Sequence, residues 1–498
     1  MKIFNTEQIR SADKFTIAHE KISSLNLMER AAEASLRWIL ANIKQSSRFS
    51  VLCGTGNNGG DGLAIARLLY HHGLDVDVFI DKSNLKFSDD ARTNYQQLSE
   101  ISGITLHDFS EFKNKISSDS IIIDAIFGTG LTRKISGPAA ELISQANALP
   151  NRKISIDLPS GLSADGQTSF DTEVFKADDT LTFQFWKKSL LHPETARFAG
   201  KVHVLDIGLS EIYIDEEQST DFIIDKTVVK NIYRPRKLYS HKGTYGKACI
   251  VGGSYGKMGA AVIAARAALE TGAGVIFAAA PDCGYTILQS TCPEAMFIKA
   301  GEKFIEDLPL EKEYTLGIGP GLGKEKQTAS ALVNFLRKYE KSLVLDADAL
   351  NILADDPKTL TNLPDFTIIT PHPKEFGRLF GETQDSYARL ELAKTKAKEL
   401  QIIIVLKDHH SQIVTPDGIV YYNTSGNPGM AKGGSGDALT GIITALLAQK
   451  YTPVEAAVFG TWLHGKAGDF AAEQHSQESM TALQLVESIG KVFRFLND

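Results

Sequence analysis

The sequence is poor in cysteine and has no long apolar run. Its four cysteines are far apart, without the C-x-x-C spacing of a zinc site or a redox pair. Scattered thiols in a chain of 498 residues favour reduced side chains over a disulfide framework. No apolar stretch approaches the roughly 18 residues that span a bilayer, and the N-terminus lacks an apolar core followed by a cleavage site. We therefore expect a cytoplasmic protein without a membrane partner.

A local excess of charge of one sign is also missing. The chain has 53 basic and 60 acidic residues, its formal net charge is −7, and no block of like charges stands out. Proteins that bind nucleic acid or anionic membranes usually carry clustered basic residues. We therefore expect small molecules as ligands and no nucleic acid.

The chain is long enough for more than one hydrophobic core, and its pattern is interrupted once. Short apolar runs alternate with amphipathic stretches through the first two hundred residues, which is the βαβ rhythm of a mostly parallel sheet. A polar, charge-mixed segment from Ser210 to Lys237 follows, and the rhythm then restarts at ACIVGGS. We predict an α/β protein of two domains, residues 1–212 and 225–498, that are not internal repeats of each other.

A glycine-rich stretch, GTGNNGGDG, spans residues 54–62 between a strand-like run and a helix-like run. It satisfies the G-x-G-x-x-G pattern of dinucleotide-binding folds, and Asp81 lies about 20 positions further on, where a ribose partner would sit. Yet Asp61 would repel a pyrophosphate, and Asn57 and Asn58 would fill space that glycine leaves open. These side chains indicate a task beyond phosphate binding.

Other predicted strands of the first half also end in polar side chains. Asp124 ends one strand, Asp157 ends another with Ser160 just beyond it, and Lys187 follows a third. Because ligands gather at the carboxyl ends of strands in open α/β sheets, we expect these groups to meet. Asn58, Asp124 and Ser160 offer oxygen ligands of low total charge, which suit a hard, weakly held cation better than zinc. Asp157 and Lys187 are a candidate acid–base pair.

The strongest local signal in the second half is GGSGD, residues 433–437, at the start of an apolar helix. Converging backbone N–H groups at a helix N-terminus form an anion hole. Beside it, Asp437 can take the proton of a hydroxyl that attacks a terminal phosphate. Lys407 in VLKD follows a predicted strand, where a nucleotide phosphate could lie. TPHPKE contains His372, and an isolated histidine of this kind more often has a structural role than a binding role.

Together these motifs resemble the bifunctional NAD(P)H-hydrate repair enzymes. NNGGDG, DAIFGTGL and IDLPSG resemble their N-terminal epimerase domain, while IVGGSYGKMGAA, GIGPGLG, LDADALN, ITPHPKE and GGSGD resemble their C-terminal dehydratase domain. The resemblance implies a Rossmann-like three-layer domain followed by a ribokinase-like three-layer domain. It also implies that the first domain interconverts the R and S hydrates of NAD(P)H. The second would dehydrate the S form with ADP, giving NAD(P)H, AMP and phosphate.

The resemblance also assigns cofactors and site residues. It implies K⁺ in the first domain and Mg²⁺ in the second, and we expect a homo-oligomer. In the first domain the implied substrate-binding residues are Asn57, Asn58, Gly59, Gly60, Asp61, Gly128, Thr129, Gly130, Leu131, Thr132, Arg133, Lys134, Asp157 and Lys187. Asp157 is the implied proton carrier, and the implied K⁺ ligands are Asn58, Asp124 and Ser160. In the second domain the residues implied to face the hydrate are Ala260, Gly321, His372 and the catalytic Asp437, and those implied to face the nucleotide are Lys407, Asp408, His409, His410, Ser411 and Gly436.

The sequence departs from the family pattern at two of these places, and two alternatives stay open. Lys187 is followed by Lys188 and Ser189 where the family commonly has Pro-Gly, and residues 408–411 read DHHS where the family usually has glycine and small residues. One alternative is a kinase of small vitamin-precursor alcohols with an accessory N-terminal domain, because GSGD alone does not separate kinase from dehydratase. The other is a first domain that only binds a nucleotide or regulates, which the intact Asp157 argues against.

Overall fold

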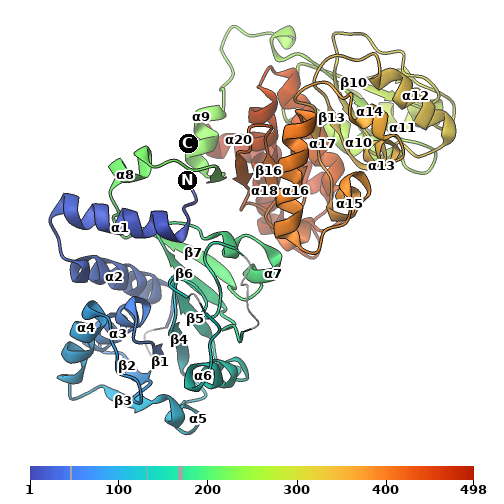
Figure 1. Cartoon of the computed structure of the whole chain (residues 1–498). Coiled ribbons are helices and arrows are strands. Elements are labelled where there is room, and N and C mark those ends of the chain that lie inside the picture. The colour runs from blue at the N-terminus through green and yellow to red at the C-terminus, as the bar shows by residue number, and fades with distance from the viewer. Residues whose placement is uncertain (45–46, 132, 167–171, 498) are drawn as a thin grey trace. The chain divides into compact units, whose positions relative to one another are not determined.

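The computed structural model describes residues 1–44, 47–131, 133–166 and 172–497. The chain divides into two compact units, Lys2–Ser219 and Thr220–Asp498 together with Met1 (Figure 1). Each unit has its own β-sheet, of seven strands in the first and ten in the second. The predicted α/β class with two domains is confirmed, while the boundaries 1–212 and 225–498 stay predictions.

All strands of the first sheet run parallel. They are β1 (Arg48–Cys53), β2 (Asp75–Ile80), β3 (Thr105–Asp108), β4 (Ile121–Ala125), β5 (Lys153–Ile156), β6 (Asp179–Phe183) and β7 (Lys201–Leu205). The sheet order is β3-β2-β1-β4-β5-β6-β7. The chain therefore steps from β1 to one edge and returns to β4 on the other side of β1. The carboxyl ends of β1 and β4 thus border the crevice where such sheets bind ligands.

Helices cover both faces of this sheet (Figure 1). The helices of this unit are α1 (Thr6–Glu20), α2 (Ser24–Asn42), α3 (Asn57–His71), α4 (Asp89–Ser99), α5 (Phe112–Lys115), α6 (Pro138–Asn147), α7 (Pro193–Ala196) and α8 (Glu211–Glu216). On β1, Val51 belongs to a core cluster with residues of α2 and α3, whereas the next residue, Leu52, belongs to a cluster with residues of α6. Because successive side chains of a strand point to opposite faces, a run as apolar as FSVLC needs a helical layer on each side.

Glycine allows the loops after β1 and β4 to meet. A Cβ atom at Gly54 would lie 2.0 Å from the carbonyl oxygen of Ile126, and one at Gly59 would lie 1.9 Å from that of Gly54. No larger residue fits at either position. These contacts bring the start of α3, and with it Asn58, against the loop that follows β4.

The second sheet is mixed. Its strands are β8 (Asp221–Ile223), β9 (Lys247–Val251), β10 (Val275–Ala280), β11 (Ala295–Lys299), β12 (Thr315–Ile318), β13 (Val344–Leu345), β14 (Ile368–Ile369), β15 (Ile403–Leu406), β16 (Gln412–Val414) and β17 (Val420–Tyr422). They follow the order β11-β10-β9-β12-β13-β14-β15-β16-β17-β8, and β16 is antiparallel to both of its neighbours. The strand order reverses between β9 and β12, which marks a second switch point.

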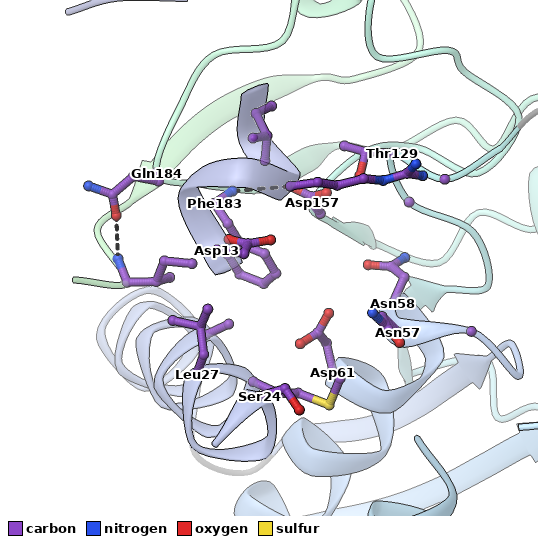
Figure 2. Close-up of a pocket in the computed structure, with 18 of the residues that line it drawn as sticks. Asp13, Ser24, Leu27, Asn57, Asn58, Asp61, Thr129, Asp157, Phe183 and Gln184 are labelled. Carbon is purple, nitrogen blue, oxygen red and sulfur yellow. Dashed lines mark hydrogen bonds between the residues drawn. The ribbon is translucent and has the colours of Figure 1, made fainter. Parts of the chain in front are cut away.

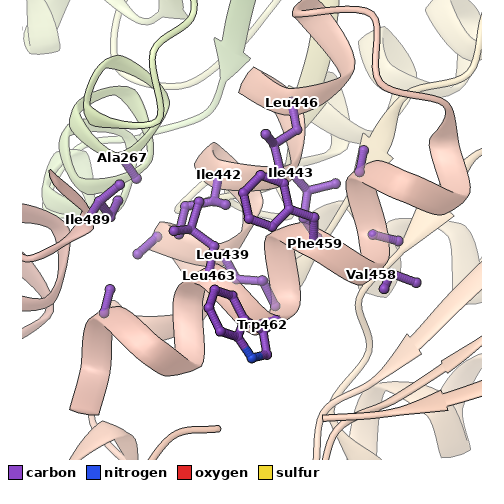
Figure 3. Close-up of a cluster of buried hydrophobic side chains, with 14 of the residues drawn as sticks. Ala267, Leu439, Ile442, Ile443, Leu446, Val458, Phe459, Trp462, Leu463 and Ile489 are labelled. Carbon is purple, nitrogen blue, oxygen red and sulfur yellow. The ribbon is translucent and has the colours of Figure 1, made fainter. Parts of the chain in front are cut away.

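A buried helix, α17, organises the core of the second unit. The helices of this unit are α9 (Lys226–Ile232), α10 (Met258–Glu270), α11 (Tyr285–Thr291), α12 (Lys326–Leu336), α13 (Ala347–Ala354), α14 (Pro357–Leu360), α15 (Pro373–Phe380), α16 (Ser386–Leu400), α17 (Ser435–Ala448), α18 (Pro453–His475), α19 (Ala482–Glu487) and α20 (Ile489–Asn497). Every residue of α17 from Ala438 onward is buried. Figure 3 shows its Leu439, Ile442 and Leu446 in the cluster that contains Phe459 of α18. Within the described part of the chain, no helix combines the length and apolarity needed to cross a membrane.

Replacement of Phe459 tests the packing of this core. Its ring is fully buried in the cluster of Figure 3. We expect Phe459→Ala to lower the free energy of unfolding of the second unit by about 3–5 kcal/mol, because the lost ring leaves a cavity. Urea titration followed by circular dichroism measures this change. Tyr239→Ala, at a side chain that is 95% exposed, is the control and should change it by less than about 0.5 kcal/mol. A loss below about 1 kcal/mol for Phe459→Ala would contradict its place in the core.

Candidate active sites in the two units

A cavity of about 600 Å³ lies in the first unit at the carboxyl ends of β1, β4 and β5 (Figure 2). The predicted substrate residues that line it are Asn57, Asn58, Asp61, Gly128, Thr129, Gly130, Leu131, Asp157 and Lys187. Gly59 and Gly60 are buried in the first turn of α3 and do not line it. Arg133 and Lys134 are exposed and also do not line it, and Thr132 lies outside the described residues.

The cavity contains a buried salt bridge between Asp157 and Lys187. The Nζ atom of Lys187 donates to Oδ1 of Asp157 at 2.6 Å, to Oγ1 of Thr182 at 2.8 Å and to the carbonyl oxygen of Phe183 at 2.9 Å. These three contacts use all three N–H groups of the ammonium, whose side chain is 1% exposed. Asp157 itself has a φ of 64°, a left-handed conformation that is strained for a residue with a side chain. Lys187 therefore fixes the orientation of the Asp157 carboxylate.

Asp124 lies buried behind the cavity with Ser160. Its carboxylate accepts from Oγ of Ser155 at 2.5 Å, from Oγ of Ser160 at 2.6 Å and from N of Ser160 at 2.9 Å. Burial raises the pKa of Asp124, while these hydrogen bonds lower it. It forms no salt bridge with any residue that the structure describes. A buried anion with only neutral donors is costly unless a cation compensates its charge.

The side chain of Asn58 has no hydrogen-bond partner among the described residues, although both of its polar atoms are buried. A Cβ atom at the neighbouring Gly128 would lie only 3.1–3.2 Å from atoms of this side chain, so glycine leaves the space around it open. Unsatisfied buried polar atoms are rare in native proteins and usually mark an ion or a water. An orphaned amide oxygen and the buried Asp124 carboxylate fit a cation with oxygen ligands.

Helices α1 and α2 supply the other wall of the cavity, and none of their residues is among those predicted from the sequence. Arg10, Asp13 and Lys14 of α1 line it, as do Ser24 and Met28. Burial raises the pKa of Asp13 to about 6, with a smaller contribution from Asp157. Burial likewise raises the pKa of Asp61, and the neighbouring carboxylates add to the effect. None of the wall residues belongs to a motif, because a cavity-lining face of an amphipathic helix looks like an ordinary buried face.

In the second unit, a partly buried ion pair joins two strand ends. Nζ of Lys407, after β15, donates to Oδ1 of Asp346, after β13, at 2.7 Å. Oγ1 of Thr440 in α17 donates to Oδ2 of the same carboxylate at 2.8 Å. A Cβ atom at Gly436 would lie 3.5 Å from Lys407 Nζ, so the predicted nucleotide residues Lys407 and Gly436 lie together. Asp346 is not among the site residues predicted from the sequence, although it lies in LDADALN directly after a strand, as Asp124 lies at the end of one.

Asp437 lies in the first turn of α17, whose start is held by a histidine. Gly434 precedes the helix with a φ of 96°, which glycine adopts without strain. Burial lowers the pKa of His464 to about 4, so its ring is neutral and Nε2–H donates to the carbonyl oxygen of Ser435 at 2.9 Å. Burial also raises the pKa of Asp437 to about 6, and Asp346 contributes to this. The first N–H groups of α17 thus lie beside a carboxyl group that titrates near neutrality.

The remaining predicted residues of the second unit occupy the same sheet edge. Ala260 and Gly321 are close, since a Cβ atom at Gly321 would lie 3.1 Å from that of Ala260. His372 caps α15, and its Nδ1 accepts from N of Lys374 at 3.1 Å. The capping role of His372 is therefore structural, and its contact with a substrate stays a prediction.

The segment predicted to face the nucleotide begins with a salt bridge. The carboxylate of Asp408 accepts a hydrogen bond from the guanidinium of Arg389. Next to it, the rings of His409 and His410 meet edge to face at 4.6 Å between their centroids. Asn423 N donates to the carbonyl oxygen of Ser411 at 2.8 Å, which ties the end of the segment to β17. The Asp408 side chain is thus engaged within the protein, and Lys407 is the residue of this segment that reaches Asp346.

Comparison with known proteins covers the whole chain. Residues 24–189 match the family model for the YjeF-related protein N-terminus, and residues 248–491 match the model for NAD(P)H-hydrate dehydratase. The bifunctional NAD(P)H-hydrate repair enzyme Nnr of Moorella thermoacetica is 35% identical, over 100% of this chain and 98% of that protein. The chain belongs to the family of bifunctional NAD(P)H-hydrate repair enzymes.

Two further proteins are similar to this chain. The Nnr of Escherichia coli K12 is 31% identical over 98% of this chain and 93% of its own length. A crystal structure of ADP/ATP-dependent NAD(P)H-hydrate dehydratase from Bacillus subtilis, co-crystallised with ATP and Mg²⁺, is 29% identical to this chain with a TM-score of 0.48. The matched region covers 55% of this chain and 98% of the Bacillus subtilis chain. The family resemblance seen in the motifs is confirmed, while the roles of individual residues stay predictions.

The salt bridge of the epimerase-type cavity can be tested by removing its cation. Lys187→Met leaves the Asp157 carboxylate without its partner, so we expect the free energy of unfolding of the first unit to fall by about 3 kcal/mol. Lys113→Met, at an exposed lysine, is the matched control and should have almost no effect. Adding Asp157→Asn to Lys187→Met should restore part of the loss in the same urea titration. Equal stability of Lys187→Met and the parent would contradict the buried pair.

Proposed function

We propose that the chain repairs hydrated NADH and NADPH in two steps. The first unit interconverts the R and S hydrates, and the second unit dehydrates the S form with ADP, giving NAD(P)H, AMP and phosphate. The full-length similarity to a bifunctional repair enzyme carries this proposal, and each unit also has polar groups gathered at the carboxyl ends of its own strands. A homo-oligomeric state and a cytoplasmic location remain predictions.

In the epimerisation step, Asp157 is the proposed proton carrier. The residues proposed to bind the hydrate are Asn57, Asn58, Gly59, Gly60, Asp61, Gly128, Thr129, Gly130, Leu131, Thr132, Arg133, Lys134, Asp157 and Lys187. The salt bridge at 2.6 Å supports this role, because it holds the Asp157 carboxylate at the cavity wall. Lys187 acts as a positioning residue, since its three N–H groups are already used within the protein.

We propose that Asn58, Asp124 and Ser160 hold K⁺ in the first unit. The orphaned Asn58 side chain and the buried Asp124 carboxylate support the site. When bound, the ion would compensate the charge of Asp124. The protein's own groups would then hold the start of α3 against the loop after β4, where the hydrate is expected to bind.

Thermal unfolding tests the cation site without relying on activity. We expect the melting temperature of the first unit to rise when Na⁺ is replaced by K⁺ at constant ionic strength, because an ion that binds only the folded state stabilises it. In Asn58→Ala this rise should disappear, while it should persist in Asn42→Ala, an exposed asparagine at the end of α2. A K⁺ response that survives in Asn58→Ala would contradict the assignment.

In the dehydration step, Asp437 is the proposed general base. It takes the proton of the hydrate's hydroxyl as that oxygen attacks the terminal phosphate of ADP, which forms one P–O bond and breaks the bond to AMP. The N–H groups at the start of α17 stabilise the phosphoryl oxygens. The phosphorylated oxygen then leaves the ring as phosphate, and the adjacent ring carbon loses a proton, whose bonding electrons form the C=C bond of NAD(P)H. The residues proposed to face the hydrate are Ala260, Gly321, His372 and Asp437. Those proposed to face the nucleotide are Lys407, Asp408, His409, His410, Ser411 and Gly436.

We propose that Mg²⁺ reaches the second unit together with the nucleotide. The structure shows no group of three or more His, Cys, Asp or Glu residues arranged for a metal, as far as the described residues go. Mg²⁺ commonly keeps several waters and binds through one or two carboxylates and the substrate's phosphates. The site therefore fits an ion whose ligands come largely from ADP, and this ion would neutralise phosphate charge.

Purified hydrate diastereomers test the whole proposal. With mixed hydrates and ADP, NADH absorbance should return completely and AMP should appear. Phosphorylation of a vitamin-precursor alcohol, without restored NADH, would favour the kinase alternative. Absence of interconversion between separated R and S hydrates would favour a regulatory first domain.

The Asp437→Asn variant tests the role of Asp437 as general base. Asparagine keeps the size of the side chain but cannot accept the proton, so we expect single-turnover dehydration of the S hydrate with ADP to slow by about 10²–10⁴-fold, with epimerisation unchanged. The raised pKa of about 6 adds a pH prediction: the base must be ionised, so the rate in the parent rises as pH increases through about 6. A rate for Asp437→Asn within about threefold of the parent would remove Asp437 from this role.

A further inference from the structure

Three carboxyl groups face the cavity of the first unit from three different elements. Figure 2 shows Asp13 of α1, Asp61 of α3 and Asp157 after β5 around the same open space. Asp157 is ion-paired with Lys187 at 2.6 Å. Asp13 and Asp61 form no hydrogen bond or salt bridge with any residue in the described ranges. A carboxyl group in such surroundings keeps its proton to higher pH than an exposed one.

The surroundings of Asp13 place it beside the Asp157–Lys187 pair. The pKa of Asp13 is raised to about 6, first by burial and then by the charge of Asp157, while the charge of Lys187 opposes the rise. The charged side chains that line the same cavity are Arg10, Lys14, Asp61, Asp90, Asp157 and Lys187. Two neighbouring carboxyl groups thus differ in their surroundings: Asp157 has Lys187 as a salt-bridge partner, and Asp13 has no such partner among the described residues. Such a difference is typical of an acid–base pair.

Interconversion of the two hydrates requires an acid and a base. The hydrate carries its hydroxyl on a ring carbon bonded to the ring nitrogen. When the C–O bond breaks, both bonding electrons leave with oxygen, and the nitrogen lone pair forms a C=N bond. Hydroxide is a poor leaving group, so an acid must give the oxygen a proton and release it as water. Water then adds to the opposite face, the C=N electrons return to nitrogen, and a base takes the extra proton.

We propose that Asp13 is the second catalytic residue of epimerisation. It donates its proton to the departing hydroxyl, and Asp157 takes the proton of the water that adds to the other face. Proton exchange with solvent restores both groups. This inference rests on the proposed function of the first unit.

Asp61 has a different part in this scheme. It lies in the NNGGDG loop, and the charges of Asp157, Asp13 and Asp90 raise its pKa further than burial alone would. As part of that loop, Asp61 is assigned to binding of the hydrate. Asp13 lies on the wall of the cavity that α1 supplies and is assigned to proton transfer.

The test compares Asp13→Asn with Glu7→Gln, a control that removes an exposed carboxylate from the same helix. Separated R and S hydrates are incubated with the full chain, interconversion is followed by chromatography, and the uncatalysed rate is subtracted. We expect Asp13→Asn to lower kcat by about 10²-fold or more, with KM within about threefold and ADP-dependent dehydration of pure S hydrate unchanged. Glu7→Gln should match the parent.

Two measurements on the parent support the test even if Asp13→Asn fails to fold. Because the acid must be protonated, kcat/KM for epimerisation should fall as pH rises through about 6, the opposite direction to dehydration. In folded Asp13→Asn this fall should be absent. In ¹⁸O-labelled water, each catalysed inversion should place the label on the product's hydroxyl.

Three results would overturn the inference: an Asp13→Asn kcat within threefold of the parent, a loss confined to KM, or product without ¹⁸O. If the fall of kcat/KM with rising pH disappeared in Asp61→Asn but persisted in Asp13→Asn, the proton donor would be Asp61. A parent protein that does not interconvert the hydrates at all would instead contradict the proposed function of the first unit.

Discussion

The meeting of strand ends at one edge of each sheet is the constraint on which both candidate sites depend. In the first unit the order reverses between β1 and β4, and in the second between β9 and β12. Chain segments leave the two central strands in opposite directions, so no crossover covers the crevice between their carboxyl ends. Polar side chains placed there do not have to be buried in the core. The loops still approach closely, and the space at Gly54 and Gly59 shows how little room is left.

The two units use the same electrostatic arrangement for opposite purposes. Each contains an aspartate paired with a lysine, Asp157 with the buried Lys187 and the buried Asp346 with the half-buried Lys407. Each also contains a second carboxyl group without an ion-pair partner in the described part of its unit, Asp13 or Asp437, whose pKa burial raises to about 6. A pKa near neutrality lets a group act as acid or as base, and the chemistry of the bound substrate decides which. One arrangement thus serves both the proposed epimerisation and the proposed phosphoryl transfer.

Several side chains combine structural and proposed chemical roles. His372 caps α15, and Asp408 pairs with Arg389. Lys187 saturates its ammonium within the protein. A residue that is already hydrogen-bonded costs less to hold in one orientation, because its rotamer freedom is lost on folding rather than on substrate binding. Such preorganisation explains why residues that resemble binding groups in the sequence are found as caps and ion pairs in the folded chain.

The sequence by itself determined the α/β class, the division into two domains, the family and the motif residues at the strand ends. These features are local: alternating apolar runs fix strands and helices, and glycine with polar residues directly after a strand marks a ligand-binding loop. Only the tertiary structure decided that α1 supplies Asp13 to the first cavity and that Asp346 pairs with Lys407. Neither residue lies near its partner in the chain. Their encounter depends on helix packing and strand order, and the periodicity of a segment does not record which buried face borders a cavity.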